Sequence, residues 1–196
     1  MKTQLIISIK IFAVLTVLCG IVYPLFITGI AQVVFPEKAN GSLIRQNNKV
    51  IGSELIGQKF DSIIYFSSRP SATDYNPQPS GGSNLGPTSS KLKQLVTERT
   101  AQFIESNQLA ASENIPSEML LASASGLDPH ISPKAALLQV DRIAKARNFS
   151  DEQKQKLLKV VTEHTENPQF SFLGETRINV LTLNIALDKL KDYTTP

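Results

Sequence analysis

The 196-residue sequence is poor in the side chains that form disulfides or bind metals. It has a single cysteine, Cys19, two histidines, His130 and His164, and no tryptophan. One cysteine excludes an internal disulfide, so a folded domain in this chain depends on its own apolar core. Neither histidine lies in a His-Glu-x-x-His motif or in a zinc-type Cys/His spacing. The sequence therefore predicts no metal site and no cofactor of its own.

The sequence also lacks clusters of one charge sign. It contains 20 Lys and Arg and 17 Asp and Glu, and setting Lys2 and Lys10 aside leaves 18 basic against 17 acidic residues. A nearly neutral chain without a basic stripe does not predict a nucleic-acid surface. The Gly-x4-Gly-Lys phosphate loop and the Gly-x-Ser-x-Gly nucleophile elbow are both missing.

The N-terminal part contains a long stretch without charge. Between Ile11 and Phe35 the only ionisable side chains are Cys19 and Tyr23, and no Asp or Glu precedes Glu37. A helix of roughly 25 residues extends about 37 Å, which is enough to cross a hydrocarbon core of about 30 Å. The stretch is too long for the core of a cleaved secretory signal and ends without an Ala-x-Ala site. We therefore predict a retained transmembrane helix over 11–35.

The first two lysines predict how this helix is oriented. Lys2 and Lys10 precede it, and positive charge favours the cytoplasmic side of a membrane. The sequence therefore predicts a single-pass membrane protein with its N-terminus in the cytoplasm. Residues 1–10 are expected in the cytoplasm, and residues 36–196 are expected to form one compact extracytoplasmic domain.

One side of the predicted membrane helix carries small and hydroxyl-bearing residues. Thr16, Gly20, Pro24 and Thr28 recur every four residues, which places them along one side of a helix. Such residues let a second helix approach closely, so we predict that this side packs against another protein helix. Pro24 lacks a backbone N–H and is expected to kink the helix.

The remaining sequence predicts an α+β domain. The pair Asn47-Asn48 between two short apolar runs predicts a hairpin of Ser42–Arg45 with Lys49–Leu55. Ser62–Phe66 reads as a further strand, and the Pro-, Gly- and Ser-rich residues 69–87 as a long loop. Helical spacing behind cap residues predicts four helices, which begin after Thr88–Ser90, at Ser132-Pro133, at Ser150 and after Asn179. For the last of these, the composition of Ile178–Leu183 is also compatible with a strand.

Two passages contain residues that could carry chemistry. Ser125, Asp128 and His130 lie within eight residues, which raises the hypothesis of a membrane-anchored hydrolase. Close neighbours on one loop rarely converge as a triad does, and turn formation explains each of them. Ser80, Gly81 and Gly82 form a triplet whose backbone N–H groups could face an anion. A sharply bending loop is the simpler interpretation of this triplet.

Several blocks in a fixed order resemble the C subunit of the bacterial Kdp potassium-transporting ATPase, the KdpC family. The resemblance covers nearly the whole chain, including the single N-terminal helix. The blocks that carry it are Gly52–Gln58, Tyr65-Phe66, Arg69–Ala72, Ser80–Pro87, Ser123–Ser132 and Asn179–Asn184.

The resemblance implies a non-catalytic accessory subunit of a high-affinity, ATP-driven potassium uptake pump in the inner membrane of a bacterium. Its implied partners are a potassium-channel-like subunit, a P-type ATPase subunit and a very small subunit, together with membrane lipid. It further implies a role in assembly and as a catalytic chaperone that raises the ATP affinity of the hydrolysing subunit. The family's proposed nucleotide contact falls on Ser80, Gly81 and Gly82, and K⁺ is carried by the complex. Three alternatives remain: a domain that shapes the ion entrance of the pump, the anchored hydrolase, and a free-standing anchored binding protein.

Overall fold

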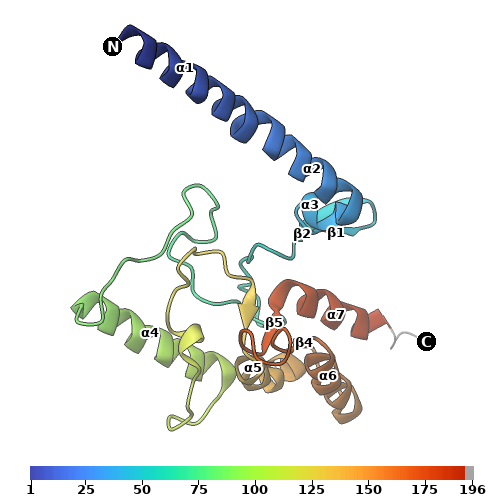
Figure 1. Ribbon diagram of the computed structural model, residues 1–196. Helices are drawn as coiled ribbons and strands as arrows, with labels where there is room; N and C mark the ends of the chain where they lie inside the picture. Colours follow the sequence, from blue (N-terminus) through green and yellow to red (C-terminus); the bar gives the residue numbers. More distant parts are fainter. Residues whose placement is uncertain (193–196) are drawn as a thin grey trace. The chain divides into compact units, whose positions relative to one another are not determined.

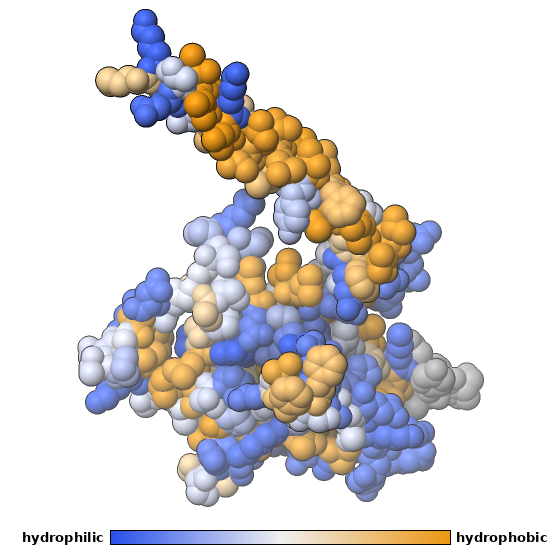
Figure 2. Space-filling view, viewed as in Figure 1, coloured by the Kyte–Doolittle hydropathy of each residue, from blue (hydrophilic) through white to orange (hydrophobic). Residues whose placement is uncertain are grey.

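The computed structural model describes residues 1–192, which divide into two compact units, Met1–Ser53 and Glu54 onward. The first unit begins with a helix that runs without a break from Lys2 to Val34 (Figure 1). It comprises α1 (Lys2–Val17), a π-helical turn (Leu18–Val22) and α2 (Tyr23–Val34). Its length and composition are sufficient to cross a membrane, and Figure 2 shows apolar residues along most of it.

A short helix and a β-hairpin follow the long helix. The helix ends at Phe35, which adopts a non-helical conformation in front of Pro36. The short helix α3 (Pro36–Ala39) and the hairpin of β1 (Leu43–Gln46) with β2 (Lys49–Ser53) come next. Asn47 and Asn48 turn the chain with φ values of 49° and 61°, which confirms the predicted Asn-Asn hairpin.

The second unit begins with a long segment that has neither helix nor strand between residues 54 and 89, and this confirms the predicted loop over 69–87. Four helices, one 3₁₀ turn and three short strands follow. They are α4 (Ser90–Asn107), η2 (Ser117–Met119), β3 (His130–Ile131), α5 (Pro133–Ala146), α6 (Asp151–Glu163), β4 (Thr165–Glu166), β5 (Arg177–Asn179) and α7 (Val180–Asp192).

The helix starts agree with the cap residues in the sequence. Ser89 and Ser132 each accept a backbone hydrogen bond with their side chains, at 3.4 and 3.1 Å. Ser150 and Gln153 form the reciprocal capping box that their spacing predicts. Hydrogen bonds between neighbouring residues therefore determine where α4, α5 and α6 begin. The presence of both helices and a small antiparallel sheet confirms the predicted α+β class.

The core lies where α5, α6 and α7 meet beside the small sheet (Figure 1). The three strands are antiparallel in the order β3-β5-β4. Ile143, Leu157, Leu183 and Leu187 are completely buried between the helices. Each such side chain contributes about 1.5–3 kcal/mol by leaving water, which makes this three-helix contact the main source of stability.

The predicted strand Ser62–Phe66 is wrong. This segment is irregular because side chains of the helices, rather than another strand, satisfy its backbone. Asn184 accepts from the N–H of Phe66 at 2.8 Å and donates to its carbonyl oxygen at 2.9 Å. Gln139 pairs with the backbone of Ser67 in the same way, at 2.7 and 3.4 Å. The apolar run predicted burial correctly, since Phe66 is fully buried, but not its partners.

Candidate functional site

The two passages that the sequence suggests for chemistry lie against each other. Ser80 Oγ donates to the carbonyl oxygen of Ser125 at 2.8 Å, and the N–H of Gly81 donates to the same oxygen at 3.0 Å. An anion-binding loop would keep such donors for its ligand. Here both donors are used by a carbonyl group of the chain itself.

Close backbone contact requires glycine at several positions around this contact. Gly126 has φ of +72°, and a Cβ atom added there would lie 2.7 Å from Thr73 Oγ1 and 2.9 Å from the carbonyl oxygen of Gly81. A Cβ on Gly57 would lie 2.7 Å from the carbonyl oxygen of Asp128. Only a residue without a side chain fits these places. We call the loops that meet here, Gly57, Arg69–Thr73, Ser80–Gly82 and Ser123–His130, the loop junction.

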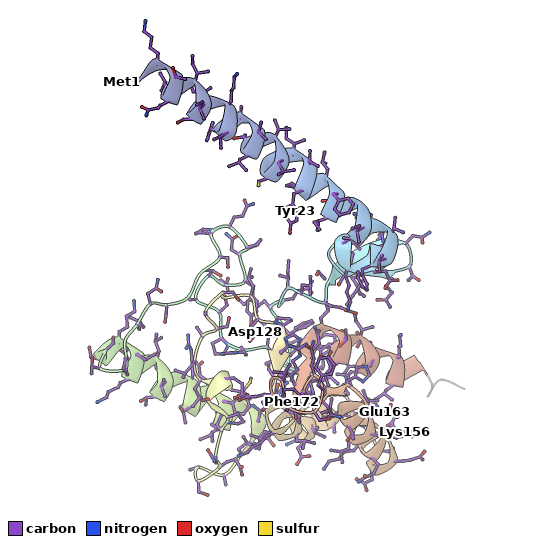
Figure 3. The ribbon with its side chains drawn as sticks, in the orientation of Figure 1. Met1, Tyr23, Asp128, Lys156, Glu163 and Phe172 are labelled. Atoms are coloured by element: carbon purple, nitrogen blue, oxygen red, sulfur yellow. The ribbon has the colours of Figure 1, made fainter. Side chains whose placement is uncertain are left out.

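Asp128 holds the charged part of the loop junction (labelled in Figure 3). One of its oxygens accepts from Arg69 Nη1 at 2.6 Å. The other accepts from the backbone N–H of His130 at 3.0 Å and lies 3.3 Å from His130 Nδ1. The Nε of Arg69 is buried without a hydrogen-bond partner among the described residues. Asp128 therefore links its own loop to Arg69, which lies 59 positions earlier in the chain.

The pKa of Asp128 reflects these contacts. Burial on its own raises the pKa of this carboxyl group, but the hydrogen bonds from His130 and the positive charge of Arg69 outweigh burial. The net result lowers the pKa of Asp128 from its ordinary 3.8 to about 2. The carboxylate is thus ionised at neutral pH and acts as the anionic partner of Arg69.

The structure brings Asp128 and His130 together but not Ser125. The Ser125 hydroxyl accepts the N–H of Leu127 at 3.1 Å, which is a turn interaction. A hydrolytic triad requires the serine hydroxyl to be hydrogen-bonded to the histidine. No hydrogen bond joins Ser125 to His130 within residues 1–192.

A cavity of about 720 Å³ lies between the loop junction and the loop that connects β4 to β5. Its size is in the usual range for a small-ligand pocket. Arg69, Asp128 and His130 line one part, and Glu166 and Arg177 line another. In the part of the chain that the structure describes, no three His, Cys, Asp or Glu side chains are grouped to hold a metal ion.

The small residues of the long N-terminal helix are all exposed along its surface. Thr16, Gly20, Pro24 and Thr28 lie on the helix as predicted, and a Cβ on Gly20 would meet nothing within 4 Å. The π-helical turn Leu18–Val22 ends two positions before Pro24, where the α-helical hydrogen-bond ladder loses a donor. That another protein helix packs against this side stays a prediction.

The sequence reasoning missed two features. Arg69 belongs to one of the blocks that resemble the KdpC family, but no local signal in the sequence indicates its pairing with Asp128. The second feature is the loop between β4 and β5, where Phe170 and Phe172 are 82% and 75% exposed. Its signal was the apolar run Phe-Ser-Phe-Leu between Pro168 and Gly174, a context typical of a surface loop.

Comparison with known proteins covers almost the entire chain. Residues 5–189 match the family described as KdpC: K⁺-transporting ATPase, c chain. The chain belongs to the KdpC family. A potassium-transporting ATPase KdpC subunit of Koribacter versatilis is 48% identical over 199 residues, covering both chains completely. The KdpC subunit of Geotalea uraniireducens is 49% identical over 93% of this chain and 96% of its own length. That of Mycobacterium tuberculosis is 44% identical over 97% of this chain and its own full length.

KdpC membership fixes the general role of the chain as a subunit of a potassium-transporting ATPase. It also gives a context for the long N-terminal helix, which suits a membrane transporter subunit. The loop junction consists largely of the blocks on which the resemblance to KdpC rests. The junction and the family assignment together lead to the functional proposal.

Proposed function

We propose that the chain is a non-catalytic accessory subunit of a high-affinity, ATP-driven potassium uptake pump. Its helix anchors it beside the large membrane subunits, and its second unit contacts them from the extracytoplasmic side. It assists assembly of the channel-like, ATP-hydrolysing and very small subunits, and it raises the ATP affinity of the hydrolysing subunit. The positive-inside bias from Lys2 and Lys10 supports this orientation.

The proposal rests on one observation: the polar groups at the loop junction form hydrogen bonds and ion pairs with one another. Ser80 and Gly81 donate to the Ser125 carbonyl oxygen, and Asp128 is occupied by Arg69 and His130. Groups engaged in this way hold loops together instead of attacking a substrate. These internal contacts support a non-catalytic role, in which the second unit acts through its shape and its surface. Direct nucleotide contact by Ser80, Gly81 and Gly82 stays a prediction of the family resemblance.

The decisive experiment compares pump complexes with and without this chain in gentle detergent. With the chain present, we expect the large membrane subunits to co-purify with it and K⁺-stimulated ATP hydrolysis to reach half its maximum at lower ATP. Purification of a stable, fully active pump without the chain would refute the accessory role. Protease added to intact cells should remove the second unit. Its survival there, with digestion only after lysis, would refute the proposed orientation.

Two single variants separate this proposal from an anchored hydrolase. Ser125→Ala and His130→Ala should each support K⁺-stimulated ATP hydrolysis as the unmodified chain does, once folding has been verified by circular dichroism. A hydrolase would lose its turnover in both variants. Ser80→Ala tests the nucleotide prediction, because a direct contact would weaken ATP binding without lowering the thermal midpoint.

A further inference from the structure

The loop between β4 and β5 presents the most concentrated exposed apolar surface of the second unit. Phe170, Phe172 and Leu173 are 82%, 75% and 51% exposed and lie within four positions. The other exposed apolar side chains of this unit form smaller groups: Leu55 and Ile56 are adjacent, and Ile63 and Leu137 stand alone, as is usual for a protein surface. Phe172 is labelled in Figure 3, and an apolar patch occupies the same place in Figure 2.

This loop is a closed turn between two paired strands. Gln169 and Leu173 exchange two backbone hydrogen bonds, each 2.9 Å long. Phe170 and Ser171 at the turn have φ values of 53° and 68°, a conformation that bulky residues rarely adopt. The turn is mounted on β4 and β5, which pair directly with each other. A strained, closed turn therefore holds two aromatic rings in water, at centroids 6.5 Å apart. We call Gln169–Leu173 the aromatic tip.

The charges around the aromatic tip indicate what covers it. Between residues 164 and 177 the ionisable side chains besides His164 are Glu166, Glu175 and Arg177. Glu166 and Arg177 form a 3.0 Å ion pair at the base of the tip. A loop that inserts into anionic lipid usually carries a surplus of Lys or Arg, and this one has a surplus of acid. Aromatic residues inside a charged rim are instead typical of the centre of a protein interface.

We propose that the aromatic tip is a docking element that inserts Phe170 and Phe172 into an apolar pocket on a large membrane subunit of the same pump. The partner surface should be apolar at its centre, with polar groups around it that complement Glu166 and Arg177. Because the tip is already closed, little conformational entropy is lost when it docks. This proposal rests on the accessory role proposed above.

A photo-crosslinking experiment in the intact pump identifies the occupant. Benzoylphenylalanine replaces Phe172, which conserves an aromatic ring, and in a matched control it replaces Leu137, an exposed apolar residue on α5. We expect an adduct with one large pump subunit, identified by mass spectrometry, at position 172 and not at 137. An adduct with phospholipid, an adduct with a second copy of this chain, or no adduct would each overturn the proposal.

A double variant measures the contribution of the tip. Phe170→Asn, which tolerates positive φ, combined with Phe172→Ser should weaken retention of the chain in the purified pump by about tenfold or more. Its thermal midpoint should stay within about 2 °C, because both side chains are exposed. Leu137→Ser should be retained normally. Equal retention of the double variant refutes the aromatic tip alone, whereas failure of the unmodified chain to co-purify refutes the accessory role.

Discussion

Replacing Asp128 by Asn tests the charged contact at the loop junction. The folded protein lowers the pKa of Asp128 from 3.8 to about 2. At about 1.36 kcal/mol per pKa unit, this difference corresponds to about 2 kcal/mol of stabilisation of the ionised form. The side chain is 27% exposed, so solvent screens the contact only partly. Asp128→Asn also leaves Arg69 without its anionic partner, and we therefore expect a loss of about 2 kcal/mol at pH 7.

The pH dependence of this loss has a defined sign. A carboxyl group whose pKa is depressed in the folded state contributes stability above its unfolded pKa, and this contribution disappears as pH falls through the folded pKa. The difference between native chain and Asp128→Asn should thus be constant above about pH 5. It should be roughly halved near pH 3 and nearly absent at pH 2.

Urea denaturation of the full chain in detergent, followed by circular dichroism at 222 nm, measures both quantities. Asp141→Asn is the matched control, because Asp141 is 77% exposed in its pair with Lys154 and should contribute little. A difference of the same size at pH 3 and pH 7 would refute the electrostatic explanation. Unchanged stability of Asp128→Asn at pH 7 would refute the stabilising role itself.

Two further predictions concern uncharged contacts. Asn184→Leu leaves the buried N–H and carbonyl group of Phe66 unpaired, and urea denaturation should show a loss of about 2–4 kcal/mol; a loss below about 1 kcal/mol would contradict this pairing. Gly174→Ala should cost about 1–2 kcal/mol, because φ is +94° but no atom lies within 4 Å of the added Cβ. Gly126→Ala should cost at least about 1 kcal/mol more, owing to the contact with Thr73 Oγ1, and equal costs at the two glycines would refute the close approach.

The parts of the fold that sequence predicted well are those set by neighbouring residues. Ser132 caps α5 through a hydrogen bond to a residue three positions away, and Asn47-Asn48 turns the hairpin through their own φ angles. The apolar stretch after Lys10 forms a helix, in which each backbone group finds its hydrogen-bond partner about four positions away. In each case the determining interaction lies within four residues, which is the range that a local pattern describes.

The errors arise where the partner is distant in sequence. The run Ser62–Phe66 has the composition of a strand, yet its backbone is paired by Asn184 and by the guanidinium groups of Arg142 and Arg147. Arg142 lies on α5, Arg147 directly follows it and Asn184 lies on α7, so each partner is at least 79 positions away in the chain. A sequence pattern indicates that such a segment is buried, but it does not indicate whether a strand or a side chain will satisfy its peptide groups.

The same distinction applies to the candidate site. A Ser-Gly-Gly triplet is compatible with an anion-binding turn and with a turn that must pass close to another backbone, and only the structure reveals the second loop. A Cβ on Gly82 would lie 3.1 Å from the Ala124 carbonyl oxygen, and Gly126 is restricted by Gly81 in turn. The blocks that carry the family resemblance therefore include residues that two loops need in order to fit each other. The close approach of the two loops explains why glycine stands at these positions. Residues that contact other pump subunits are therefore to be sought on exposed surfaces that the internal packing of this unit does not explain. The aromatic tip is such a surface, because Phe170 and Phe172 are 82% and 75% exposed.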